Sequence, residues 1–231
     1  MKNFTKSILI ALIIGISSCE TSPIEQKVDI GKDYFPMQKG HFRIYNINEI
    51  IYTLGDPDTF IYQLKTVVID SFLNAESTYT YVIHRSVRDE ASEPWTYKDT
   101  WSSRLVNNQA IESEENIDFV KLIFPFEVGI KWNGNAFNNR GEEDYELESE
   151  GTKTLNNETF DDCIVIKQRD NQDFIVNFDQ RYETYAKNVG LVYVDKTQLF
   201  YCSDADLGCI GKQIVDEGVI YKQTIVDYGV E

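Results

Sequence analysis

The chain has 231 residues and carries 22 Lys and Arg against 38 Asp and Glu, a formal net charge of −16. A surface this acidic repels phosphate backbones, and no cluster of basic residues interrupts it, so nucleic acid is excluded as an expected partner. Beyond the first twenty residues, no apolar run approaches the length of about 18 residues that a membrane-spanning helix needs. The composition therefore predicts a solvated domain whose activity must be inferred from individual motifs.

The first residues, MKNFTKSILIALIIGISSCE, have the pattern of an export signal. Lys2 and Lys6 precede an apolar run of nine residues from Ile8 to Ile16. A helix of that length spans about 14 Å, roughly half of a bilayer's hydrocarbon core, so it is too short to cross a membrane. The run has the size of a signal-peptide core.

The residues that end this run, Ile16-Ser17-Ser18-Cys19, resemble the lipobox of bacterial lipoproteins. The resemblance implies that residues 1–18 are a lipoprotein signal peptide and that Cys19 becomes an acylated N-terminus. Several acyl chains together anchor a protein stably in a membrane, since each buried methylene contributes about 0.8 kcal/mol. We therefore expect a membrane-anchored protein of the cell envelope. Glu20 occupies the place of the aspartate that retains some lipoproteins at the inner membrane, and this favours the outer membrane.

Residues 19–33 predict a flexible tether, because the segment ETSPIEQKVDIGKD is polar and has no helical or strand period. It could extend to at most about 50 Å. Residues 34–231 contain no Pro/Ser-rich break, internal repeat or low-complexity tract, so they predict a single extracytoplasmic domain. A division near residues 136–140 is the alternative.

Strand patterns dominate this domain. The segment FIYQLKTVVID alternates two side-chain faces, and TYTYVIHRSV, DFVKLIFPF, CIVIKQ, FIVNFD, GLVYVD and VIYKQTIVDY are similar. Turn compositions lie between them, namely LGDPD, LNAES, WNGNAFNN, RDNQ and DEG. These features predict an all-β fold with a mostly antiparallel sheet, either a β-sandwich or an open barrel. Little helix is expected. A short helix near residues 111–116 is the one exception that the pattern leaves open.

Four segments resemble a family of uncharacterised bacterial lipoproteins and secreted proteins: DYFPMQKGHFRIY, FPFEVGIKW, ETFDDCIVIKQ and ETYAKNVGLVYV. These proteins share a YFPxxxG opening, an FxxC strand and a YAxxVGLV turn. The resemblance covers most of residues 34–195 and implies an antiparallel β domain. It implies no chemistry.

The cysteines beyond Cys19 divide into a pair and a single residue. Cys202 and Cys209 lie in FYCSDADLGCIG, and a hairpin loop of that size can bring two cysteines within disulfide distance in an oxidising compartment. Two unpaired thiols are the alternative. Cys163 lies in an apolar strand and predicts a small buried hydrophobe. His41 and His84 stand in no recognisable arrangement with a nucleophile, so no catalytic residue is assigned.

Two acidic motifs have simple interpretations. Asp204 and Asp206 resemble the start of a calcium loop, but the closing glutamate is missing, so an acidic turn is expected and neither a metal nor another cofactor. Glu146, Glu148 and Glu150 alternate with other residues and should share one strand face. Such a row could hold a cation or act in acid/base chemistry, although a solvated face is the expectation.

Trp95, Tyr97 and Trp101 have the spacing of one strand face. A row of aromatic side chains could stack on a ligand, or it could belong to the core, and we expect the core for at least Trp101. These observations favour a non-enzymatic binding or assembly module that holds a protein, glycan or apolar ligand at the outer membrane. The alternative is a hydrolase displayed on the envelope that uses a carboxylate pair such as Glu146 and Glu148.

Overall fold

The computed structural model describes residues 30–231; the predicted signal peptide, Cys19 and the tether up to residue 29 lie outside them. A short 3₁₀ helix, η1 (Lys32–Tyr34), precedes twelve strands. The strands are β1 (His41–Thr53), β2 (Asp56–Leu73), β3 (Tyr79–Arg88), β4 (Thr96–Val106), β5 (Gln109–Glu114), β6 (Ile117–Ile123), β7 (Lys131–Asn133), β8 (Asp144–Leu155), β9 (Glu158–Asp173), β10 (Asn177–Ala186), β11 (Gly190–Tyr201) and β12 (Val215–Val230).

All strands belong to one antiparallel sheet with the order β6-β5-β4-β3-β2-β1-β12-β11-β10-β9-β8-β7. The chain forms two meanders, β1 to β6 and β7 to β12, and the first strand pairs with the last strand to join them. The predicted all-β, antiparallel class is confirmed. Because every strand lies in one sheet, the fold is the open barrel and not the sandwich.

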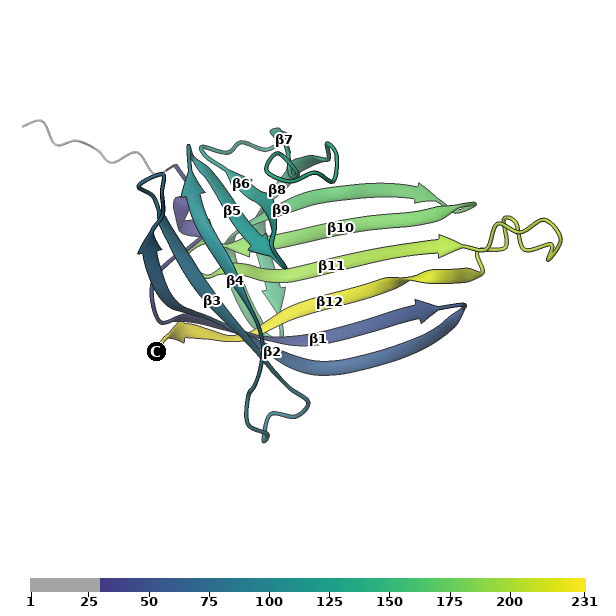
Figure 1. The fold of residues 1–231 in the computed structure, drawn as a ribbon, viewed down its shortest axis with the longest axis horizontal. Helices are drawn as coiled ribbons and strands as arrows, with labels where there is room; N and C mark the ends of the chain where they lie inside the picture. Colours follow the sequence, from purple (N-terminus) through teal and green to yellow (C-terminus); the bar gives the residue numbers. More distant parts are fainter. Residues whose placement is uncertain (1–29) are drawn as a thin grey trace, which may run out of the picture.

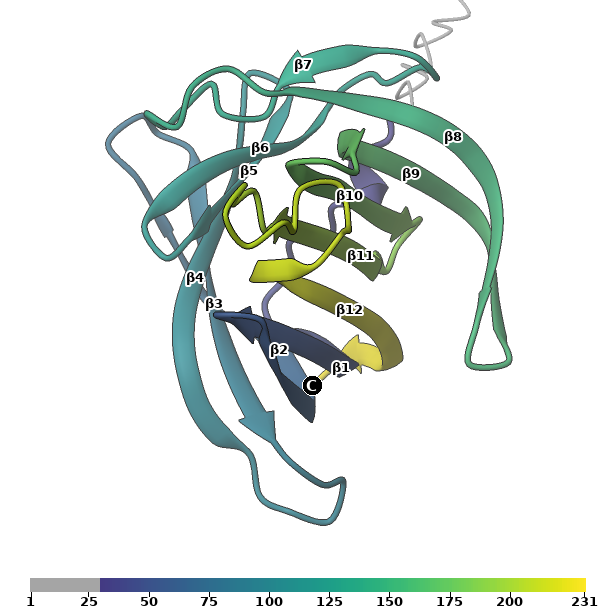
Figure 2. The same ribbon diagram turned by 90° about the vertical axis from the view of Figure 1, so that its right-hand side faces the viewer.

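The sheet curls until its two edges meet at one end. In Figure 1, strands β9 to β12, β1 and β2 run side by side, while β3 to β6 cross them steeply; Figure 2 shows the resulting arch. The edge strand β6 is bonded to the chain at and after β7: the Val120 amide donates to the Gly134 carbonyl (2.9 Å), and Trp132 Nε1 donates to the Val120 carbonyl (2.8 Å). These bonds nearly close the barrel.

An apolar core fills this closed end, and we call it the closed-end core. Ile30, Tyr34, Met37 and other partly buried side chains pack against it. The Asp33 carbonyl also accepts a hydrogen bond from the Asn188 amide (2.8 Å). Residues 30–33, predicted as the end of the tether, therefore belong to the folded domain. The buried members of the closed-end core are Phe35, Ala110, Ile111, Val120, Leu122, Phe124, Trp132, Tyr145, Leu147, Ile164, Ile166 and Tyr185.

The long β8–β9 hairpin bends back toward the last strand. Asn156 Nδ2, in its turn, donates to the Ile225 carbonyl of β12 (3.0 Å). The Tyr228 hydroxyl donates to Glu158 Oε1 (2.8 Å), and its ring lies 6.0 Å from that of Phe160. Cys163 is free and buried in a second apolar cluster beside this hairpin.

Several local predictions were wrong. Residues 109–114 form β5, and Glu115 and Asn116 form the next turn with positive φ angles of 51° and 66°, so no helix lies at 111–116. The segments RDNQ and DEG lie inside β9 and β12, and the β9–β10 turn is the apolar Phe174–Val176. Strand ends that extend beyond the core are solvated on both faces, so their polar residues resembled turns.

Within residues 30–231, no helix is long and apolar enough to cross a membrane.

Candidate functional site

The inner face of the curled sheet encloses a cavity of about 800 Å³. Its lining includes eight Lys or Arg and eight Asp or Glu residues. The whole chain has far more acids than bases, 38 against 22, so the cavity is enriched in positive charge relative to the rest of the molecule. Tyrosines from five strands add aromatic surface: Tyr45, Tyr62, Tyr145, Tyr182, Tyr185 and Tyr221.

A buried ion-pair network connects opposite walls of the cavity. Lys121 of β6 donates to Glu114 of β5 (2.9 Å) and to Glu183 of β10 (2.5 Å), and the Tyr185 hydroxyl donates to the second oxygen of Glu183 (2.6 Å). Burial lowers the pKa of Lys121, but the carboxylates of Glu114 and Glu183 outweigh it and the pKa is raised. Lys121 is therefore a fixed cation and not a nucleophilic amine.

Glu112 is a carboxyl group that can hold a proton inside the cavity. The Ser103 hydroxyl donates to its Oε2 atom (2.9 Å). Burial raises the pKa of Glu112, the Glu114 carboxylate raises it further, and the opposing effects of Lys121 and Arg43 are smaller. Perturbed carboxyl groups of this kind are typical of binding and active sites.

A second group of charges lies on β10 and β11. Arg181 binds Glu143 and Asp179, the latter at 2.8 Å, and Lys196 lies directly opposite Arg181 in the sheet register. Burial lowers the pKa of Lys196, and the neighbouring guanidinium lowers it further. Two cations side by side on a sheet destabilise it, so this arrangement is not explained by fold stability.

Three buried N–H donors that line the cavity have no hydrogen-bond partner among the described residues. They are Arg43 Nε, Arg85 Nε and Trp101 Nε1. An unsatisfied buried donor costs about 1–3 kcal/mol. The sequence interpretation missed both arginines, although each occupies an inward position of an alternating strand.

Arg85 is held by two contacts that leave its Nε atom free. Its Nη1 atom donates to both carboxylate oxygens of Asp99 (3.1 and 2.9 Å). Its guanidinium lies over the Trp101 ring, 3.5 Å from the centroid. Arg85 is only 7% exposed, so its position in the cavity wall is fixed.

The predicted row of Trp95, Tyr97 and Trp101 does not form. Arg85 pairs with Asp99 and Ser86 pairs with Tyr97, so Lys98 is an extra residue in β4 and the side-chain alternation shifts by one. Trp101 consequently lies inside, half-buried in the cavity wall and outside the buried clusters. Tyr97 is 60% exposed on the opposite face.

The three glutamates of β8 do not share a face either. Glu146 pairs with Lys167 and Glu150 pairs with Ile164, because Glu148 is an extra residue in the ladder. Lys167 binds both Glu146 (3.0 Å) and Glu148 (3.4 Å). The hydrogen bond from Lys167 to Glu146 lowers the pKa of Glu146. None of the three lines the cavity.

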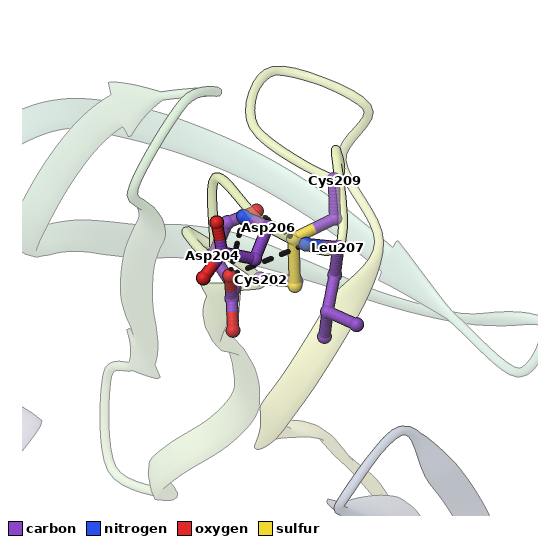
Figure 3. The surroundings of a disulfide bond; sticks show 5 residues. All are labelled: Cys202, Asp204, Asp206, Leu207 and Cys209. Atoms are coloured by element: carbon purple, nitrogen blue, oxygen red, sulfur yellow. Dashed lines mark hydrogen bonds between the residues drawn. A yellow bond between two sulfur atoms is a disulfide. The ribbon is translucent and has the colours of Figure 1, made fainter.

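The loop between β11 and β12 contains the predicted disulfide between Cys202 and Cys209, with Cα atoms 5.8 Å apart (Figure 3). Asp204 Oδ1 accepts hydrogen bonds from the amides of Asp206 (2.7 Å) and Leu207 (3.3 Å), so this carboxylate caps a turn. Among the described residues, no group of three or more His, Cys, Asp or Glu could hold a metal.

Exposed apolar side chains gather at the hairpin turns opposite the closed end. The β1–β2, β9–β10 and β11–β12 connections lie together at the right of Figure 1. The open end of the molecule is thus bordered by apolar tips. These exposed residues are Leu54, Phe174, Ile175, Val176, Leu207, Ile210 and Ile214.

Neither a family model nor a curated protein matches the sequence of this chain. Two solved structures are similar to it. One is a protein of Bacteroides fragilis NCTC 9343 described as exported, with a YmcC-like fold; it is 13% identical, with a TM-score of 0.45 over 84% of this chain and 98% of that chain. The other is a protein of Parabacteroides distasonis ATCC 8503 described as a lipoprotein; it is 12% identical, with a TM-score of 0.40 over 85% and 98%. This similarity transfers no activity, so the site is interpreted from its own residues.

Proposed function

We propose that the chain is a lipoprotein anchored through Cys19 at the outer membrane, and that it is a non-enzymatic binding module whose ligand occupies the inner cavity. The observation that carries this proposal is the lining: buried donors without acceptors and closely spaced cations, arranged around a cavity of about 800 Å³. That volume lies in the range of small-molecule sites, about 300–1,000 Å³.

The place where the folded domain begins supports a ligand that enters at the open end. Ile30 packs on the closed-end core, so the tether leaves the domain there. The ten residues between Cys19 and Ile30 allow at most about 40 Å between anchor and domain. The closed end is then the end nearer the anchor, and the open end is free for the ligand.

The hydrolase alternative has less support. Glu146 and Glu148 share Lys167 away from the cavity, and the lowered pKa of Glu146 does not suit a general acid. Four carboxylates of the cavity lining are bound by two lining cations, Lys121 and Arg181, and are not free to attack a substrate. We therefore place the ligand, and not a reaction, at the centre of the proposal.

Titration calorimetry with naphthalene-2-sulfonamide, a neutral aromatic probe, tests the binding role. The full-length chain in nonionic detergent should bind it with a stoichiometry of one. Val194→Trp places an indole ring in part of the cavity and should weaken binding strongly, because Val194 lines it. Thr197→Trp lies on the same strand but not in the lining and is the matched control. Equal binding by both variants would refute the cavity as the site.

Membrane fractionation tests the anchor. Cys19→Ala should release the protein from the membrane fraction without altering its circular dichroism, because no described strand includes Cys19. Retention of the variant in the outer-membrane fraction would contradict acylation at this residue, and wild-type protein in the inner-membrane fraction would contradict the proposed location.

A further inference from the structure

We propose that the corner of the cavity formed by Arg43, Arg85 and Trp101 is a subsite for an oxyanion, the carboxylate, sulfate or phosphate group of the ligand. This inference rests on the proposed function. It adds the chemical class of the group that the cavity recognises.

The sheet register brings the corner together. Arg43 of β1 lies opposite Thr66 of β2, and Thr66 lies opposite Arg85 of β3. Adjacent strands are about 4.8 Å apart, so the two arginine backbones are separated by about 10 Å on one face of the sheet. Trp101 lies one row further, opposite Ile83. Two arginine side chains at this spacing can reach a single group between them.

The orientation of Arg85 is set before any ligand binds. Asp99 occupies its Nη1 atom and the Trp101 ring fixes its plane, so the unpartnered Nε atom is a fixed donor. Trp101 Nε1 is a second donor in the same wall, also buried and without a partner. Donors held in this way lose little freedom when a ligand binds.

Arg43 adds a positive charge without a counter-ion close by. It makes no ion pair within 4 Å in residues 30–231, and its Nε atom is buried without a partner. A Cβ atom on Gly190 would collide with its Nη1 atom, so the guanidinium lies against the β10–β11 turn. The acids that act on this corner are Asp99, which pairs with Arg85, and Glu112, which the field of Arg43 reaches.

The three unpartnered nitrogen atoms are all N–H donors, and two belong to groups that always carry a positive charge. The buried Thr66 hydroxyl between the two arginines also has no partner and can donate as well. A ligand that satisfies them must supply acceptor oxygens and negative charge, and charge-assisted hydrogen bonds of this kind are the strong ones. A neutral glycan or a purely apolar ligand would satisfy the donors only in part.

The test compares naphthalene-2-sulfonate with the neutral naphthalene-2-sulfonamide by calorimetry on the full-length chain. The sulfonate should bind about tenfold or more tightly than the sulfonamide. Arg43→Gln should lower the ratio of sulfonate to sulfonamide affinity about tenfold and leave the sulfonamide affinity within about twofold. Arg88→Gln removes the same charge from a residue that lies on the same strand as Arg85 but does not line the cavity, and it should leave the ratio within about twofold. Naphthalene-2-carboxylate and 2-naphthyl phosphate identify the preferred oxyanion.

Each outcome decides the inference. If both probes bind in the cavity and Arg43→Gln behaves as Arg88→Gln does, the oxyanion subsite is wrong and the proposed function stands. If neither probe binds, the proposed function fails and the subsite falls with it. If Arg43→Gln does not fold, Trp101→Phe decides, because it keeps an aromatic ring and removes one donor. It should lower the ratio about threefold or more, and an unchanged ratio would overturn the subsite.

Discussion

The closed end and the cavity belong to one sheet but obey opposite rules of composition. At the closed end, inward residues such as Leu147 and Ile166 are apolar and fully buried. In the cavity, inward positions carry charges: Glu183 lies opposite Ile166 in the sheet register and binds Lys121 across the interior. The difference separates the part of the sheet that stabilises the fold from the part that is available for ligand binding.

Fold stability alone does not account for the charged region. Buried ion pairs are often no better than apolar side chains of the same volume, and unpartnered donors are a net loss. Proteins keep such destabilising groups mainly where function needs them. The comparison therefore predicts that substitutions at the closed end reduce stability, whereas some substitutions in the cavity increase it.

Lys121→Met should have the largest effect. It leaves the Glu183 and Glu114 carboxylates buried without their cation, which typically costs about 3–5 kcal/mol. Urea unfolding should show that Lys121→Met combined with Glu183→Gln is more stable than Lys121→Met alone. A double variant as unstable as the single one would mean that the network is not a coupled pair.

Ile166→Ala against Val194→Ala compares the two regions directly. Ile166 is fully buried in the closed-end core, so Ile166→Ala should lower the free energy of unfolding by about 2–5 kcal/mol. Val194 is half-buried and borders the cavity, so its loss should be about 1 kcal/mol or less. Equal losses in chemical denaturation would show that the cavity wall is packed as tightly as the core.

His41, near the closed end, should make stability fall in acid. Burial lowers its pKa to about 4 from 6.5, and Arg43 adds to the shift. The unfolded state therefore binds more protons between these values, and stability should fall by up to about 3 kcal/mol as the pH drops from 6.5 to 4. His41→Asn should flatten this part of the stability profile. If the variant keeps the wild-type slope of stability against pH, other groups cause the loss of stability in acid.

Glu112→Gln should have the smallest effect and the opposite sign. Because its pKa is raised above 4.5, Glu112 contributes to stability below that pH and loses the contribution as the pH rises through the folded pKa. The uncharged amide should thus stabilise the protein at pH 8 by about 0.5–2 kcal/mol, with no gain near pH 4. Destabilisation at pH 8 in thermal melts would show that the charged carboxylate is needed for the fold.

Alternation in the sequence was sufficient for the fold class but not for the cavity. Segments such as FIYQLKTVVID predicted strands correctly, since period-two patterns depend on local sequence. The polar face of such a strand normally points to solvent, and the pattern gives no sign that the sheet curls its polar face around an interior. No feature of the sequence therefore distinguished Arg43, Arg85 and Lys121 from surface residues.

Extra residues in the ladders account for the other failures. One bulge residue reverses the faces of all the residues that follow it, and Lys98 and Glu148 each do so. The aromatic row and the glutamate row were predicted on the assumption of an unbroken alternation. The disulfide was easier to predict, because it closes a short loop whose geometry depends on local spacing.

The most direct test of the central claim is a crystal structure of the chain with 6-bromonaphthalene-2-sulfonate, in which the anomalous signal of bromine locates the probe. The account predicts a bromine peak inside the cavity and sulfonate oxygens within hydrogen-bond distance of Arg43 Nε, Arg85 Nε or Trp101 Nε1. A probe bound only outside the cavity, or in the cavity with its sulfonate turned away from these three donors, would contradict it.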